Sequence, residues 1–241
     1  MIPPVSGYKG IDIFLSVQSG SGQIFTSHYI SHDIVGGDYY AIKNLGDNRY
    51  GLILADVMGH GIAAALYTMH LSSLWNRHHR LLKNPLLFLD AINDELVTVI
   101  KQEGSFATAV CGLIDLNEHV FQFAGAGGPE AVLMHEDGTT ECLKSDGLPL
   151  GIMSAYDYEQ LTCAFDPGDS LLLFSDGAIE IENADGNMLG PEGLIEIIKS
   201  QGYPQLPIQM VALEEALLQY SNAIRLEDDL TIIEIRLKKI S

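Results

Sequence analysis

Aspartates at the ends of apolar, strand-like segments are the residues of this chain best suited to chemistry. They are Asp38 after a glycine pair, Asp56 after the run 52–55, Asp176 after the run 171–175, and Asp228-Asp229 before the run 230–235. A carboxylate beside a buried strand is costly unless it is paired, hydrogen-bonded or bound to a cation. Because no lysine or arginine adjoins these aspartates in the sequence, the pattern indicates a metal cation.

The segment from Asp56 to Gly61 carries a second signal. A strand ends in a carboxylate, glycines follow, and a helix is expected to begin near Gly59-His60-Gly61. Free N–H groups at a helix start can receive an anionic oxygen. Asp176-Gly177 is open to two interpretations, because Asp137-Gly138 and similar pairs elsewhere are typical of plain turns.

The elements that must position these residues follow from periodicity and turn chemistry. Strands are predicted at 11–17, 38–43, 50–56, 106–115, 119–123, 131–135, 139–143, 169–175 and 230–237. Helices are predicted at 61–80, from 85 to about 104, at 191–200 and at 207–220. Leu89, Ile92, Leu96 and Val99 form one apolar helix face. Hairpin-rich strands with helices in separate blocks predict an antiparallel α+β layer fold.

Composition limits the classes of function. The chain has 241 residues, of which 47% are hydrophobic, and carries a formal net charge of −19. One domain over 1–241 is expected, since no linker or repeat divides it. An acidic chain is a poor partner for nucleic acid or anionic membranes. Three widely spaced cysteines are interpreted as buried thiols of a reducing compartment, and no signal peptide or membrane span is apparent. We therefore expect a cytoplasmic location.

These motifs, taken together and in order, resemble the metal-dependent protein phosphatase family of protein phosphatase 2C, and most of all its bacterial SpoIIE/RsbU branch. The resemblance rests on Gly36-Gly37-Asp38-Tyr39-Tyr40, on Asp56-Val57-Met58-Gly59-His60-Gly61, on Ser175-Asp176-Gly177 and on Asp228-Asp229-Leu230-Thr231. It implies an αββα sandwich of two antiparallel sheets flanked by helices. It also implies two Mn²⁺ or Mg²⁺ ions and hydrolysis of phosphoserine or phosphothreonine in a protein.

The resemblance assigns roles residue by residue. Asp38 and Asp56 match catalytic metal ligands, with Asp56 as the bridging one, and the Val57 carbonyl matches a further metal contact. Asp176 and Asp228 match the later ligands, while Asp229 occupies the position of an asparagine and is the lesser candidate. His60 is a candidate general acid by proximity alone, and a role in ordering the loop is an equal alternative.

The chemistry of such a site agrees with these roles. Carboxylates, carbonyls and water suit hard cations. Two such ions about 4 Å apart can share a water, lower its pKa and direct it at phosphorus. The chain has no recognisable nucleophilic Cys or Ser motif, as expected for an enzyme that forms no covalent phosphoenzyme.

The branch also implies a substrate and a context. The expected substrate is a serine-phosphorylated, STAS-type anti-sigma-factor antagonist of bacterial partner-switching signalling. The chain is expected to be a C-terminal output domain governed by a sensor or receiver domain. Two alternatives remain open: a catalytically weak or inactive relative that binds phosphoproteins, and an oxygen-rich cation-binding module with a structural role.

Overall fold

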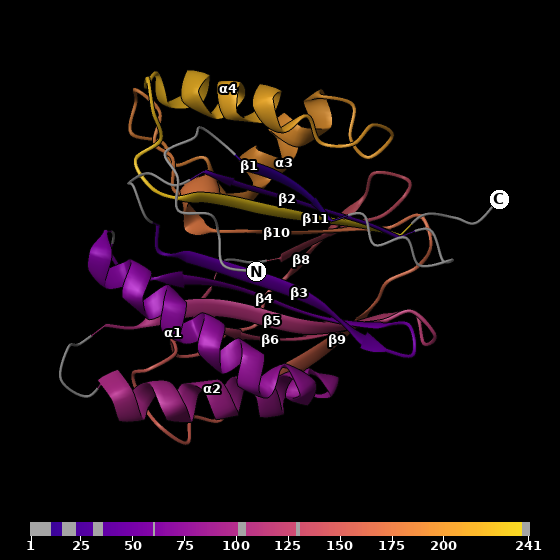
Figure 1. Cartoon of the computed structure of the whole chain (residues 1–241). Coiled ribbons are helices and arrows are strands. Elements are labelled where there is room, and N and C mark those ends of the chain that lie inside the picture. The colour runs from indigo at the N-terminus through magenta and orange to yellow at the C-terminus, as the bar shows by residue number, and fades with distance from the viewer. Residues whose placement is uncertain are drawn as a thin grey trace. The chain divides into compact units, whose positions relative to one another are not determined.

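The computed structural model describes residues 11–15, 23–30, 36–59, 61–100, 105–128 and 131–237. They form two compact units, each built on one antiparallel sheet with its own helices (Figure 1). Within the described ranges, the first unit spans 36–128 and 144–166, and the second takes 11–15, 23–30, 131–143 and 167–237. Two antiparallel sheets and four α-helices confirm the predicted α+β class.

The sheet of the first unit has the strand order β3-β4-β5-β6-β9. Its strands are β3 (Asp38–Gly46), β4 (Arg49–Val57), β5 (Ala107–Asp115), β6 (Val120–Ala126) and β9 (Gln160–Ala164). Strands β3 and β4 are joined by Asp47 and Asn48, whose φ angles are 52° and 57°. Two consecutive positive φ values define the type I′ turn, which matches the twist of a tight hairpin. The turn, together with a one-residue register shift between Asn44 and Gly46, fixes which residues of β3 and β4 lie opposite each other.

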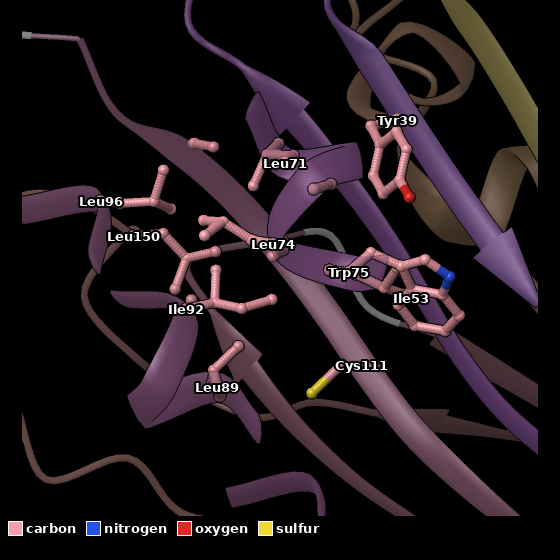
Figure 2. Close-up of a cluster of buried hydrophobic side chains, with 14 of the residues drawn as sticks. Tyr39, Ile53, Leu71, Leu74, Trp75, Leu89, Ile92, Leu96, Cys111 and Leu150 are labelled. Atoms are coloured by element: carbon pink, nitrogen blue, oxygen red, sulfur yellow. The ribbon is translucent and has the colours of Figure 1, made fainter. Parts of the chain in front are cut away.

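Helices α1 (Ile62–His78) and α2 (Pro85–Ile100) connect β4 to β5, with the 3₁₀ turn η1 (His79–Lys83) between them. They cover one face of the sheet, and their apolar side chains meet those of the strands in a single cluster (Figure 2). Leu89, Ile92 and Leu96 are fully buried in it, which confirms the predicted stripe. The fourth member, Val99, has a side chain outside the described residues.

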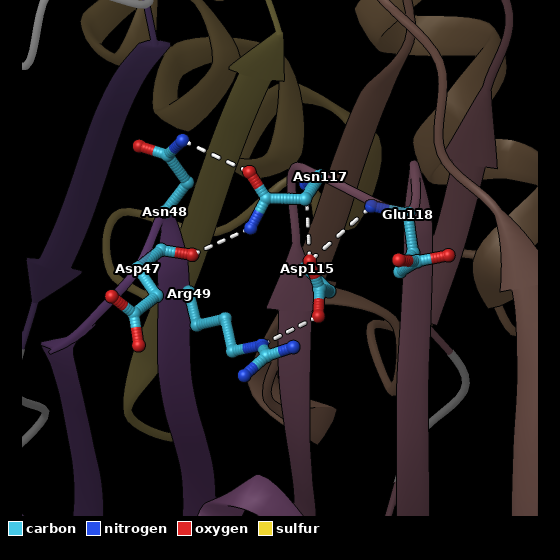
Figure 3. A network of polar contacts seen from close by, with 6 residues as sticks. All are labelled: Asp47, Asn48, Arg49, Asp115, Asn117 and Glu118. Carbon is cyan, nitrogen blue, oxygen red and sulfur yellow. Dashed lines mark hydrogen bonds and ion pairs between the residues drawn. The ribbon is translucent and has the colours of Figure 1, made fainter.

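A polar network closes the end of this sheet where the two hairpins turn (Figure 3). Nε of Arg49 lies 2.6 Å from Oδ2 of Asp115. The other oxygen of that carboxylate accepts from the amide N–H groups of Asn117 and Glu118 at 3.0 and 3.3 Å. The Asn117 side chain in turn donates to the Asp47 carbonyl at 2.7 Å. The two hairpin turns are thereby tied together.

The sheet of the second unit has the order β1-β2-β11-β10-β7-β8. Its strands are β1 (Ile11–Leu15), β2 (Gln23–Ile30), β7 (Ala131–Met134), β8 (Thr140–Leu143), β10 (Ser170–Phe174) and β11 (Leu230–Leu237). The last strand, β11, is thus an interior strand with β2 and β10 as neighbours. Helices α3 (Gly190–Ser200) and α4 (Met210–Ser221) pack on this sheet through a second apolar cluster.

Several sequence expectations need correction. Strands β2 and β9 were not predicted, and the first helix ends at His78 instead of near Arg80, because a 3₁₀ turn takes over. Only Cys111 of the three cysteines is buried, whereas Cys142 is exposed and Cys163 half-buried. Among the described residues, no helix has the length and apolar character needed to cross a membrane.

Candidate functional site

Asp38 and Asp56 are direct partners across β3 and β4. The next pair along, Gly37 and Val57, is hydrogen-bonded through the Val57 amide and the Gly37 carbonyl at 3.2 Å. The aspartates therefore occupy the adjacent non-hydrogen-bonded position, where side chains approach most closely. Like charges directly opposite each other destabilise a sheet. Two facing carboxylates are consequently a place where a cation would add stability.

The alternation of side chains along β3 places these carboxylates away from the helices. Tyr39 and, on the paired strand, Ala55 and Val57 belong to the helix-side cluster, and Figure 2 shows Tyr39 within it. Burial raises the pKa of Tyr39 to about 12, more than a hydrogen bond with Ser72 lowers it. Since successive residues point to opposite faces, Asp38 and Asp56 lie on the other face. Asp38 is only 4% exposed there.

The space beside Gly37 is lined by oxygen atoms. A methyl group on Gly37 would lie 2.9 Å from the Val57 carbonyl oxygen, 3.1 Å from the Gly59 carbonyl oxygen and 3.4 Å from Oδ1 of Asp56. A carboxylate and two carbonyls thus border a space that any larger residue would fill. Oxygen donors of this kind suit magnesium and manganese. The residues present therefore fit the metal that the resemblance implies.

The N-cap of helix α1 is Gly61, four residues after Val57, at φ 78°, and no side chain caps the helix. The first amide N–H groups of a helix have no partner within that helix. Those of α1 consequently offer donors to an anion close to Asp56 in the chain. His60, the candidate general acid, lies outside the described residues.

The second unit brings Asp176 and Asp228 together through the segments that carry them. Ser175 and Thr231 exchange backbone and side-chain hydrogen bonds: the Ser175 amide donates to the Thr231 carbonyl at 3.0 Å, and the Thr231 amide donates to Ser175 Oγ at 2.9 Å. Ser175 Oγ also donates to the Asp229 carbonyl at 3.2 Å. This holds the start of the 3₁₀ turn η2 (Asp176–Ala178) against the residues that lead into β11.

Asp228 and Asp229 have different surroundings. Asp228 is exposed and, with Asp176, lines a cavity of about 520 Å³ in the second unit. Asp229 is only 4% exposed, and its amide donates to Oδ1 of Asp228 at 2.8 Å. The cavity-lining member of the pair is the one that the resemblance matches to a metal ligand.

The predicted site residues therefore lie in two groups, with Asp38, Asp56 and Val57 in the first unit and Asp176, Asp228 and Asp229 in the second. Within the described ranges, no three His, Cys, Asp or Glu side chains converge in a way that could hold a metal by themselves. The sequence analysis gave Ser175 and Thr231 no individual role. The one hint in the sequence was the position of Ser175 between an apolar strand and Asp176-Gly177, where its hydroxyl can hydrogen-bond a neighbouring strand.

Comparison with known proteins identifies the class. The SiaA-PP2C domain of Pseudomonas aeruginosa superposes with a TM-score of 0.77 at 21% identity, over 88% of this chain and 85% of that one. RsbX, solved in complex with magnesium, gives a TM-score of 0.63 at 15% identity over 95% of this chain and all of the other. The fold is that of the protein phosphatase 2C class.

The family described as Stage II sporulation protein E (SpoIIE) matches residues 46–238. The chain belongs to this family, which confirms the predicted resemblance. Phosphoserine phosphatase RsbU of Bacillus subtilis is 29% identical over 203 residues, 84% of this chain and 59% of RsbU. Phosphoserine phosphatase RsbP of the same organism is 27% identical over 157 residues, 64% of this chain and 39% of RsbP. The chain thus spans between about two-fifths and three-fifths of these two relatives.

Proposed function

We propose that this chain is a metal-dependent protein serine/threonine phosphatase that acts in partner-switching signalling. The observation that carries the proposal is the direct opposition of Asp38 and Asp56, with the carbonyls of Val57 and Gly59 around the space beside Gly37. The naming of RsbU and RsbP as phosphoserine phosphatases supports the reaction. Asp176 and Asp228 are assigned metal-ligand roles by resemblance, with Asp229 as the lesser candidate.

Each candidate residue has a proposed role in the reaction. Asp38 and Asp56 hold divalent cations, Mn²⁺ or Mg²⁺ and two in number by resemblance, with the Val57 carbonyl as a further ligand. When bound, such ions lower the pKa of a water and offset charge on the phosphoryl oxygens. The uncapped amides at the start of α1 donate to a phosphoryl oxygen. His60 is the candidate that returns a proton to the departing serine oxygen.

The proposed substrate is a serine-phosphorylated anti-sigma-factor antagonist of the STAS type. A solved structure of the RsbU and RsbW domains of Rv1364c from Mycobacterium tuberculosis shares the fold with a TM-score of 0.73 at 22% identity. A fused or docked sensor or receiver domain is the proposed regulator. With a net charge of −19, long-range repulsion of an acidic phosphoprotein is strongest at low salt. Productive encounter therefore depends on a specific docking face.

The test is phosphate release from a phosphoserine protein by the purified chain, with Mn²⁺, with Mg²⁺ and with EDTA. We expect turnover only with a divalent ion, and a fall of about a hundredfold or more in Asp56→Asn, which loses a ligand charge. Asp137→Asn is the matched control, because Asp137 lies in the β7–β8 hairpin turn, where it accepts from Thr139. Full activity of folded Asp56→Asn would exclude the assigned metal role.

The same proteins and the same phosphoprotein also distinguish two alternative functions. A phosphoprotein-binding relative would bind the phosphoprotein in EDTA and release no phosphate under any condition. A structural cation-binding module would bind Mn²⁺ and gain thermal stability from it, but would neither bind nor hydrolyse the phosphoprotein.

A further inference from the structure

The cavity of about 520 Å³ beside Asp176 and Asp228 contains an unusual side chain for so acidic a protein. Among the described residues that line it, Arg225 is the only basic one, and Glu180, Glu182 and Glu227 add three more carboxylates. An arginine in the same cavity as two candidate metal ligands needs an explanation. It either pairs with its acidic neighbours or serves a ligand.

The other arginines of the described chain indicate which explanation is better. The chain has five arginines. Arg49 pairs with Asp115, Arg77 with Glu95 and Arg236 with Glu234. Arg80 and Arg225 form neither an ion pair nor a hydrogen bond with any described residue. Of these two, only Arg225 lines the cavity, where Glu227 and Glu182 lie as well. Its five N–H donors are consequently available to a ligand.

Arg225 is carried by a connection that the fold holds in place. Helix α4 ends at Ser221, and its C-cap Asn222 adopts the left-handed conformation with φ 54° and ψ 32°. The Ala223 amide donates to the Leu218 carbonyl at 3.1 Å. The Asn187 carbonyl, next in sequence to the lining residue Met188, accepts from the Tyr220 hydroxyl at 3.1 Å. The last turn of α4 is thus tied to the segment that precedes Met188.

We propose that Arg225 is a substrate-binding residue that grips the phosphoryl group of a phosphomonoester. The inference rests on the proposed phosphatase function and extends it to a residue that sequence analysis did not single out. A guanidinium binds phosphate oxygens in a bidentate, charge-assisted manner. An exposed pair with Glu227 or Glu182 would contribute little to stability, because solvent screens it. The dianion is therefore the stronger partner.

The experiment compares Arg225→Ala, Arg225→Lys and Arg225→Glu with Arg80→Ala, which removes the same charge from an exposed position in η1. Three quantities are measured in Mn²⁺: KM and kcat for a phosphoserine protein, and the Kd of inorganic phosphate by calorimetry. Loss of a charge-assisted bond of about 1.5–3 kcal/mol corresponds to a rise of about ten- to a hundredfold in KM and Kd. Arg225→Lys should keep part of the affinity, and Arg80→Ala should match the wild type.

The outcomes separate this inference from the proposed function. If the wild type is active and Arg225→Ala keeps its KM and phosphate Kd, Arg225 does not bind the phosphoryl group. If Arg80→Ala raises KM and Kd as much as Arg225→Ala does, the effect comes from the overall charge of the protein and not from a contact of Arg225. If the wild type shows no turnover with any metal, the proposed function fails, and the calorimetric comparison of phosphate binding alone decides on Arg225. A lowered Tm with unchanged Kd would make Arg225 a structural residue.

Discussion

Gly177 lies so close to Asp229 that a methyl group on it would sit 2.0 Å from the Asp229 carbonyl oxygen. Backbone atoms cannot yield as a flexible side chain does, so Gly177→Ala must displace η2 or the segment before β11. We expect a loss of about 1–3 kcal/mol in the free energy of unfolding and weaker Mn²⁺ binding, because Asp176 and Asp228 lose their fixed positions. Denaturant titration and calorimetry measure the two effects.

Gly193→Ala provides the control. A methyl group on Gly193 would meet Cδ1 of Leu189 at 2.6 Å, which is the end of a side chain that can rotate away. Its Mn²⁺ affinity should remain that of the wild type. Equal loss of metal binding in both variants would show that the close backbone contact at Gly177 does not position the aspartates.

The Asp228-Asp229 pair allows a sharper test of the assignment. Asp228→Asn should weaken Mn²⁺ binding and slow turnover more than Asp229→Asn, because Asp228 lines the cavity and Asp229 is buried. Asp229→Asn should act mainly on stability. The reverse order of metal affinities would mean that the resemblance has been aligned one residue out of register.

His60→Ala tests the candidate general acid. A serine alkoxide needs a proton as it leaves, whereas p-nitrophenolate is a good leaving group that hardly needs one. We expect turnover of a phosphoserine substrate to fall far more than turnover of p-nitrophenyl phosphate. An equal fall on both substrates would indicate that His60 orders the loop after Asp56.

Asp115 predicts a pH dependence of stability. Burial tends to raise the pKa of Asp115, but the hydrogen bond from Arg49 and those from the Asn117 and Glu118 amides outweigh it and lower the pKa. A carboxyl whose pKa is lower when folded stabilises the protein fully above its unfolded pKa of about 4 and loses that effect as pH falls through the folded value. The contribution should therefore disappear in acid.

The measurement is the free energy of unfolding as a function of pH for the wild type and Asp115→Asn. Other carboxylates also titrate in this range, so the difference between the two proteins is the informative quantity. That difference should be constant near neutrality and shrink below about pH 4. If the stability difference between wild type and Asp115→Asn does not change with pH, the ion pair with Arg49 is not its cause.

Leu89→Ala tests the helix-side core of the first unit. Leu89 is completely buried, so its truncation should cost about 2–5 kcal/mol in the free energy of unfolding. Leu87→Ala, on the same helix and 53% exposed, should cost no more than about 0.5 kcal/mol. Similar costs for both variants would show that α2 does not bury the predicted face.

The elements with strong periodicity were predictable from sequence, and those that depend on neighbours were not. The α2 stripe and the Asp137-Gly138 hairpin follow from local patterns, and both are present. Strand β2 mixes polar and apolar residues and becomes a strand by pairing with β11 along its whole length. Strand β9 is an edge strand that pairs with β6 alone. Neither partner is visible in the local sequence.

The candidate site divides in the same way. The aspartates could be found from the sequence, because charged residues beside apolar strands are rare without a reason. Their pairing could not, since the opposition of Asp38 and Asp56 depends on the Asp47-Asn48 turn and on the one-residue register shift between Asn44 and Gly46. Arg225 could not be recognised from the sequence either, because only the structure shows that it lines the same cavity as Asp176 and Asp228.

The interior position of β11 has a consequence for synthesis on the ribosome. Strands β3, β4, β5 and β6 are neighbours in the order in which they are made, so the first sheet can assemble while translation continues. Strand β2 precedes β3 in the chain, but among the described strands it pairs with β1 and with β11, which comes after all the others. The nascent β1–β2 pair therefore keeps one edge open until β11 has been made. Exposed strand edges promote aggregation, so the interval before β11 appears is the time when the growing polypeptide most needs chaperones.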